Sequence, residues 1–206
     1  MGFSTLARRA IAPSCAGAAL VLALYGSTAS GADAPWHSYT DAARGFTVSY
    51  PDGWTLNPAF DDQGYGYAQG ELTDHIVGVF LGAPADLQAD TNLRAGQTYV
   101  LIETLPRSAD KCVAADFIVD PPADYRIFDE RHDGDRALLT SGDPGDMSAK
   151  EDSVTVLSHA PCLGVHESIG FAPRDGEFGR DERPFDRDKV VKLLDAIRAT
   201  VVAVPR

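Results

Sequence analysis

Four residues that could bind a metal or support hydrolysis lie close together late in the chain: His159, Cys162, His166 and Glu167. Zinc sites use such ligands at short spacings, usually in tetrahedral geometry. The spacing here matches no closed zinc site, and residues 166 and 167 would point to opposite faces of a strand. We therefore expect core or surface histidines. The alternative is a hydrolase or metal-dependent enzyme that uses His159, His166 and Glu167.

The most charged stretch of the chain, residues 129–135, contains a second group of candidate ligands. Acidic residues at alternating positions, with a glycine among them, resemble a calcium loop. However, Arg131 occupies a middle ligand position, and Thr140 stands where the loop needs a bidentate glutamate. We expect a solvated turn without a bound metal. A calcium site would use the acids Asp129, Asp133 and Asp135.

Nucleophilic catalysis and aromatic stacking are two further possibilities. Ser168 lies in His-Glu-Ser-Ile-Gly, which lacks the first glycine of a nucleophile elbow, so no catalytic residue is predicted. Tyr65 and Tyr67 would share one strand face and, if exposed, could face a sugar or peptide ligand. Tyrosines in such a pattern more often pack half-buried. The nearby glycines do not form a dinucleotide loop, and no cofactor is predicted.

The first 32 residues have the composition of a secretory signal peptide. Two arginines precede an apolar segment at residues 11–25, and small residues follow at 26–32. This order of charged, apolar and small residues is typical of a cleavable export signal. The apolar run is short for a membrane-spanning helix, which needs ~20 apolar residues. We expect cleavage after Ala32 or Ala29, a periplasmic or secreted product, and no membrane span after cleavage.

The cysteines are consistent with export. Cys15 lies in the leader, which leaves Cys112 and Cys162 as a pair. Two thiols in one small exported domain usually form a disulfide. Closing that loop would stabilise the fold by about 4 kcal/mol in the chain-entropy model. Two buried free thiols, or a thiol nucleophile, remain the alternative.

The charge of the chain restricts its partners. The full chain has a net charge of −12, and loss of two leader arginines leaves 16 basic and 30 acidic residues, a net charge of −14. Such a field repels nucleic acid and anionic headgroups, which are bound through Lys and Arg. The remaining length suits one domain, residues 33–206. We expect its partner to be an envelope or extracellular protein or a cell-wall component.

Hydrophobic patterns predict the elements that position these residues. Residues 46–50 alternate apolar and polar, followed by a Pro-Asp-Gly turn and Trp54 as a core residue. A short helix is predicted at 111–119, and a longer one at 187–201, capped by Asp186 and apolar on one face. Further strands are predicted at 65–68, 76–81, 98–102, 125–128, 136–139, 153–158 and 162–171.

The domain resembles the exported PsbP-like proteins of bacteria. The resemblance starts at Tyr39-Thr40-Asp41, continues through Gly45–Trp54, and extends loosely to the closing helix at 185–198. It implies an α+β fold: an antiparallel sheet flanked by helices, an α/β/α sandwich with a long C-terminal helix. Members are mostly binding or assembly-support proteins, so the resemblance implies a non-enzymatic role. It implies no catalytic residue and no particular partner.

Overall fold

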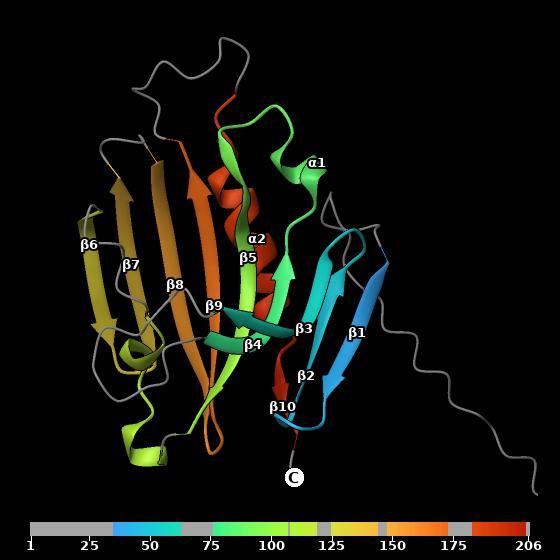
Figure 1. The fold of residues 1–206 in the computed structure, drawn as a ribbon, viewed down its shortest axis with the longest axis vertical. Coiled ribbons are helices and arrows are strands. Elements are labelled where there is room, and N and C mark those ends of the chain that lie inside the picture. The colour runs from blue at the N-terminus through green and yellow to red at the C-terminus, as the bar shows by residue number, and fades with distance from the viewer. Residues whose placement is uncertain are drawn as a thin grey trace, which may run out of the picture. The chain divides into compact units, whose positions relative to one another are not determined.

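Antiparallel sheets dominate the computed structural model, which describes residues 35–62, 76–106, 108–118, 125–143, 148–172 and 183–204. A three-stranded sheet consists, in spatial order, of β1 (Trp36–Asp41), β2 (Phe46–Pro51) and β10 (Val202–Ala203). A seven-stranded sheet consists, in spatial order, of β3 (Thr55–Asp62), β4 (Ile76–Gly82), β5 (Leu93–Leu105), β9 (Cys162–Phe171), β8 (Ser148–His159), β7 (Arg136–Asp143) and β6 (Arg126–Asp133). Neighbouring strands are antiparallel throughout (Figure 1).

Most of the predicted strands lie within observed ones. The segments predicted at 46–50, 76–81 and 98–102 fall in β2, β4 and β5. The segment predicted at 125–128 overlaps β6, which begins at Arg126, and the three later segments fall in β7 to β9. The predicted strand at 65–68 lies outside the described residues. Strands β1 and β3 were not predicted, because neither shows a clear apolar alternation: β1 is mostly exposed, and β3 contains Pro58 at a register shift.

Helix α2 (Arg187–Arg198) begins where the cap was predicted: Asp186 Oδ1 accepts a hydrogen bond from Lys189 N at 3.1 Å. Its buried stripe is Val190, Leu194 and Ile197. The helix ends three residues before the predicted Val201. Thr200 Oγ1 accepts a hydrogen bond from Ser49 N of β2 at 2.8 Å, which ties the chain to the small sheet just beyond the helix.

The predicted α+β sandwich, with helices on both faces and a long C-terminal helix, is wrong, because the described chain is mostly β. Helix α2 lies on one face, behind β5 and β9 in Figure 1, and has 12 residues. On the other face, the helix predicted at 111–119 is replaced by two short 3₁₀ turns, η1 (Ala109–Lys111) and η2 (Ala114–Phe117). The buried residues there, Cys112, Ala114 and Phe117, are not spaced for an α-helical stripe. The remaining helix, α1 (Ala85–Gln88), is a single turn.

Each face of the large sheet carries its own core. On the α2 face, residues of β2, β4, β5 and β9 pack with α2, and Trp54 belongs to this core at 7% exposure, as predicted. On the opposite face, which carries η1 and η2 and which we call the η face, Phe117 lies against Gly164 of β9. A Cβ atom at position 164 would stand 2.5 Å from the Phe117 ring. The described residues include no helix long and apolar enough to cross a membrane.

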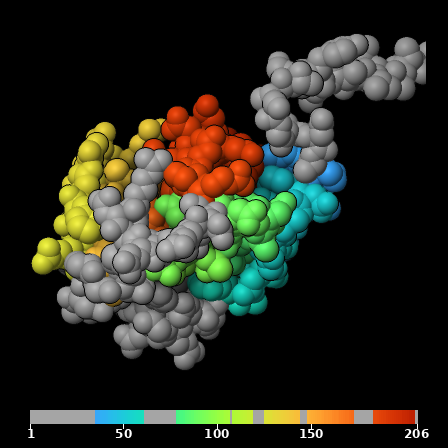
Figure 2. Space-filling view, turned by 90° about the horizontal axis from the view of Figure 1, so that it is seen from above, coloured from blue at the N-terminus to red at the C-terminus, as the bar shows by residue number. Residues whose placement is uncertain are grey.

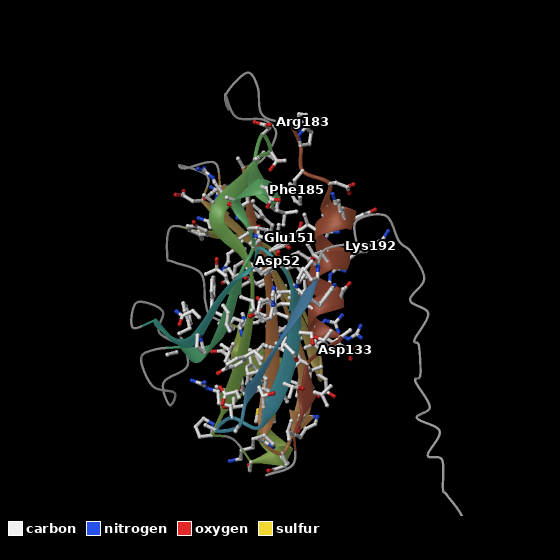
Figure 3. The ribbon with its side chains drawn as sticks, turned by 90° about the vertical axis from the view of Figure 1, so that its right-hand side faces the viewer. Asp52, Asp133, Glu151, Arg183, Phe185 and Lys192 are labelled. Carbon is white, nitrogen blue, oxygen red and sulfur yellow. A yellow bond between two sulfur atoms is a disulfide. The ribbon has the colours of Figure 1, made fainter. Side chains whose placement is uncertain are left out.

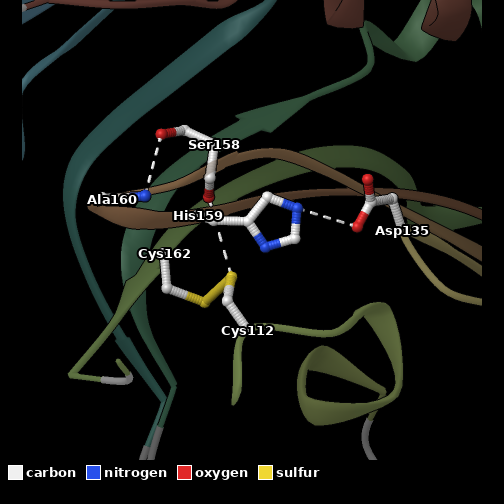
Figure 4. Close-up of a disulfide and its surroundings, with 6 residues drawn as sticks. All are labelled: Cys112, Asp135, Ser158, His159, Ala160 and Cys162. Carbon is white, nitrogen blue, oxygen red and sulfur yellow. Dashed lines mark hydrogen bonds and ion pairs between the residues drawn. A yellow bond between two sulfur atoms is a disulfide. The ribbon is translucent and has the colours of Figure 1, made fainter. Parts of the chain in front are cut away.

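The predicted disulfide between Cys112 and Cys162 is confirmed (Figure 4). The Cα atoms are 5.5 Å apart, and both residues are almost fully buried in the core of the η face. Cys112 lies between the two 3₁₀ turns, and Cys162 begins β9. The bond therefore fastens a segment with little regular structure to the centre of the large sheet.

Candidate functional site

The three residues of the alternative enzyme site lie in three different places. His159 is at the exposed end of β8, with Nε2 3.0 Å from Asp135 Oδ1 (Figure 4). His166 is buried on the η face, with Nε2 2.9 Å from Glu103 Oε2. Glu167 follows on the opposite face, as strand alternation predicts. In the described part of the chain no three His, Cys, Asp or Glu side chains could together hold a metal.

The three acids of the candidate calcium loop also separate. They lie around the β6–β7 hairpin, whose turn contains Gly134 at φ 55°. Asp129 pairs with Arg131 at 2.6 Å, and Asp135 pairs with His159. Asp133 faces a cavity beside α2. The charged stretch therefore forms a strand end and turn rather than a ligand loop.

The other residues considered for chemistry do not form a reactive group. Ser168 is fully buried within β9, where a nucleophile could not meet a substrate. Cys162 is held in the disulfide and has no free thiol. Tyr65 and Tyr67, the possible ligand-facing pair, lie outside the described residues.

A trough runs along α2 on the face of the large sheet where β8, β7 and β6 extend beyond the helix; we call it the α2 trough. In Figure 2 the red atoms of α2 lie between the yellow atoms of β6 and β7 and the blue atoms of β1. Two adjoining hollows form it: an inner cavity of about 120 Å³ and an outer cavity of about 240 Å³. Both are lined by Leu138, Ser153, Glu167 and Asp195.

The wall and floor of the trough follow from helix and strand periodicity. One side of α2 supplies residues spaced by four, four and three: Arg187, Val191, Asp195 and Arg198. The floor follows the strand register, in which Glu167 stands opposite Ser153, Ser153 opposite Leu138, and Leu138 opposite Arg131. With ~4.8 Å between strands, this row leads from the covered centre of the sheet to its edge.

The outer cavity lies at the C-terminal end of α2. Asp133 is beside this part of the helix in Figure 3, and it shares the cavity lining with Arg198 and with Arg136 of β7. At the other end of the trough, Arg187 Nη2 donates to Glu151 Oε2 at 2.6 Å, and Arg187 Nε donates to Oε1 at 3.0 Å. The trough is thus lined by alternating charges of both signs.

Glu167 is the most unusual polar residue of the trough. Its side chain is only 8% exposed, and Oε2 accepts hydrogen bonds from Ser153 Oγ and Arg198 Nε, each at 3.1 Å. Oε1 is buried and has no hydrogen-bond partner among the described residues. Burial raises the pKa of Glu167, and the charge of Arg198 only partly opposes that rise. A carboxylate is therefore held in a desolvated place with half of its acceptor capacity unused.

Sequence reasoning selected Glu167 and Asp133 but for other sites, and it missed Ser153, Asp195 and Arg198. One signal was available: the charged residues of the last helix follow the same spacing as its apolar stripe, on an adjacent side. That spacing shows that they share a wall. It does not show which strands lie opposite them.

Comparison with known proteins adds a weak structural similarity. No protein-family model matches the chain, and no curated protein matches it. Among solved structures, the chain is similar to the solution structure of cyanobacterial PsbP (CyanoP) from Synechocystis sp. PCC 6803. The match has a TM-score of 0.39 and 18% identity, and it covers 87% of this chain and 98% of that chain. A similarity of this degree assigns neither a function nor a partner.

Proposed function

We propose that the chain is an exported protein of the cell envelope, periplasmic or secreted, which binds a partner without catalysing a reaction, and that the α2 trough is its binding site. The observation that carries the proposal is the unpaired buried carboxylate oxygen of Glu167. Leaving a buried acceptor without a donor costs about 1–3 kcal/mol of free energy, and the cost is larger when the acceptor is charged. A partner that supplies the missing donor would recover that cost.

The residues that line the trough support binding rather than catalysis. The described lining contains no His or Cys, and its one hydroxyl beside the carboxylate, Ser153, donates to a Glu167 oxygen that Arg198 also engages, so the carboxylate that would act as the base is already held by a cation. Acyl transfer needs a nucleophile, a base and a group that orients the base. The alternative enzyme built on His159, His166 and Glu167 would need these residues to meet, and they lie apart.

The composition of the lining favours a protein partner. Among the described residues, the cations of the lining are four arginines and no lysine: Arg131, Arg136, Arg187 and Arg198. Protein interfaces are enriched in Arg and depleted in Lys, because the planar guanidinium forms several directed hydrogen bonds at a low entropic cost. The predicted net charge of −14 for the exported chain argues against nucleic acid.

A capture experiment with matched variants tests the proposal. The chain is expressed with its own leader, purified after export, and used to capture partners from envelope extract at low and high salt. Thr155→Lys places a long side chain in the outer cavity, and Thr40→Lys places the same change on β1, away from the trough. We expect Thr155→Lys to lose the captured partner and Thr40→Lys to keep it, both with unchanged circular dichroism. Capture of the same partners by both variants would rule out the trough.

A further inference from the structure

We infer that the inner cavity of the α2 trough binds an aliphatic primary ammonium group, such as a lysine side chain of the partner. The inference rests on the proposed function of the trough and names the chemistry of its ligand. Four observations support it: the charge around the cavity, its apolar walls, the unpaired oxygen of Glu167 and the charge of the whole chain.

The charge around the inner cavity is negative. Three carboxylates line it, those of Glu151, Glu167 and Asp195, against a single lining cation, Arg187, which Glu151 engages with both oxygens. Arg198 lies just outside the inner cavity and forms ion pairs with both Glu167 and Asp195. The group thus has three carboxylates and two guanidinium groups. One further cation would neutralise it.

Apart from Ser153, the uncharged residues that line the inner cavity are aliphatic: Leu138, Ile169, Val191 and Leu194. Such walls suit the methylene stem of an amine, which packs on apolar surface while its head stays polar. None of the described lining residues is aromatic, so the cavity lacks the ring faces that bind quaternary ammonium groups. At about 120 Å³ the cavity suits a small organic group, since a cavity of roughly 150 Å³ holds benzene.

The unpaired oxygen supplies the acceptor. Glu167 Oε1 is covered in the unliganded molecule, so binding requires the carboxyl group to turn toward the cavity about its last torsion, which is soft in glutamate. An ammonium has three donors, which Glu167 and Asp195 can accept together with the Ser153 hydroxyl. The added cation favours the ionised carboxyl and so opposes the rise in its pKa caused by burial.

The acidic chain assists the encounter with such a ligand. The full-length net charge is −12, and a field of that sign raises the local concentration of cations and accelerates their association. A basic partner segment would therefore be attracted at long range, and the cavity would select its lysine at short range.

Binding of small probes to the exported product tests the inference directly. We expect n-butylamine and Nα-acetyl-lysine methylamide to raise the melting temperature and to give saturable heats in calorimetry. We expect n-butanol, of similar size but neutral, and tetramethylammonium to give neither. Glu167→Gln should weaken amine binding at least tenfold, whereas Glu130→Gln on the exposed side of β6 should leave it unchanged.

A second variant keeps the test decisive if Glu167→Gln does not fold. Val191→Phe fills the cavity from the α2 wall without removing a charge, and Val202→Phe makes the same change at an exposed position of β10. The first should abolish amine binding and the second should not. Equal binding of n-butanol and n-butylamine, or amine binding that survives both Glu167→Gln and Val191→Phe, would overturn the inference.

The two sources of an ammonium are distinguished with the captured partner. If the cavity takes a lysine of that partner, acetylation of the partner's lysines abolishes capture and n-butylamine competes with capture. Capture that survives acetylation, with n-butylamine still bound, assigns the cavity to a free small amine and overturns the lysine assignment. If Thr155→Lys loses the partner but no amine binds, the proposed function stands and this inference fails. If Thr155→Lys keeps the partner, the proposed function fails.

Discussion

Glu167 is a residue at which burial and hydrogen bonding oppose each other. Strand alternation directs it under α2, where Arg198 and Ser153 satisfy one oxygen and leave the other bare. Asp41 is the opposite case: burial alone would raise its pKa, but hydrogen bonds from Arg44 outweigh that effect and lower it. The two carboxyls therefore make opposite contributions to the pH dependence of stability.

The stability cost of Glu167 should decrease in mild acid. Because its pKa is raised in the folded state, the folded protein takes up a proton before the unfolded one does, so its contribution to the free energy of unfolding increases as pH falls from 7 toward the ordinary value of 4.5. Glu167→Gln cannot titrate and should lack this gain. Urea unfolding of both proteins between pH 7.5 and 4.5 measures it; a constant difference across that range would contradict the prediction.

Asp41→Asn should destabilise the fold by about 1–3 kcal/mol at pH 7, because charged hydrogen bonds of this kind contribute that much. Asp41 is 5% exposed, with Oδ1 accepting from Arg44 N at 2.8 Å and Oδ2 from Arg44 Nη1 at 2.5 Å. The stabilisation is present above the ordinary pKa and lost as pH falls through the lowered one. Asp110→Asn, at an exposed position of η1, serves as the control in urea titrations at pH 7 and pH 3.

At the scale of elements, the two faces of the large sheet are covered by different structures, and each is attached in a different way. Helix α2 packs through an apolar stripe on one face, and the disulfide fastens the 3₁₀ turns to the other. The helix is short and covers only part of this face of the large sheet, which leaves β6, β7 and β8 open beside it. The trough exists because one helix is too narrow to cover seven strands.

Breaking the disulfide should loosen the η face. Cys112→Ser is expected to destabilise the protein by about 2–5 kcal/mol, since the bond restricts the unfolded chain over a sequence separation of 50. Reduced and oxidised wild type are compared by thermal melting, with hydrogen exchange of residues 109–118 as the local readout. Identical melting of the two forms would mean that the bond does not contribute.

Truncation of two neighbouring leucines of α2 should reduce the free energy of unfolding by very different amounts. Leu194 is 2% exposed within the main core, and Leu194→Ala is expected to cost about 2–5 kcal/mol. Leu193, partly exposed on the adjacent side, is the matched control and should cost clearly less. Urea unfolding measures both; similar losses would show that α2 is rotated relative to the sheet.

At the scale of the whole molecule, the expectations depend on export. The leader predicts a mature chain with a net charge of −14 and an oxidised cysteine pair. These two properties favour an envelope or extracellular partner over nucleic acid. The disulfide of the chain suits a protein that works outside the reducing cytosol.

Expression with the native leader in a bacterium should yield a periplasmic or secreted product that begins at Asp33, or at Ser30 if cleavage follows Ala29. Its intact mass should be two hydrogens lower than that of the reduced form. Mass spectrometry before and after reduction measures both features. A cytosolic product that retains Met1 and free thiols at residues 112 and 162 would disprove the export proposal.

Local patterns in the sequence determined the strands with apolar alternation, the cap at Asp186, the core position of Trp54 and the pairing of two cysteines. Each depends on residues close in the chain or on simple counting. The same patterns could not show that the segment around Cys112 lacks a helix, because a few buried residues fit several local structures. They also could not show that the fold is mostly β.

Only the tertiary structure decided where the polar residues meet. Glu167, Ser153, Leu138 and Arg131 come from four strands, and their row depends on strand order and register. Sequence spacing contains neither of these. The position of α2 over β9 then makes Glu167 a buried carboxylate, since burial depends on what covers a residue. For the same reason, His159, His166 and Glu167 are near in sequence and separate in space.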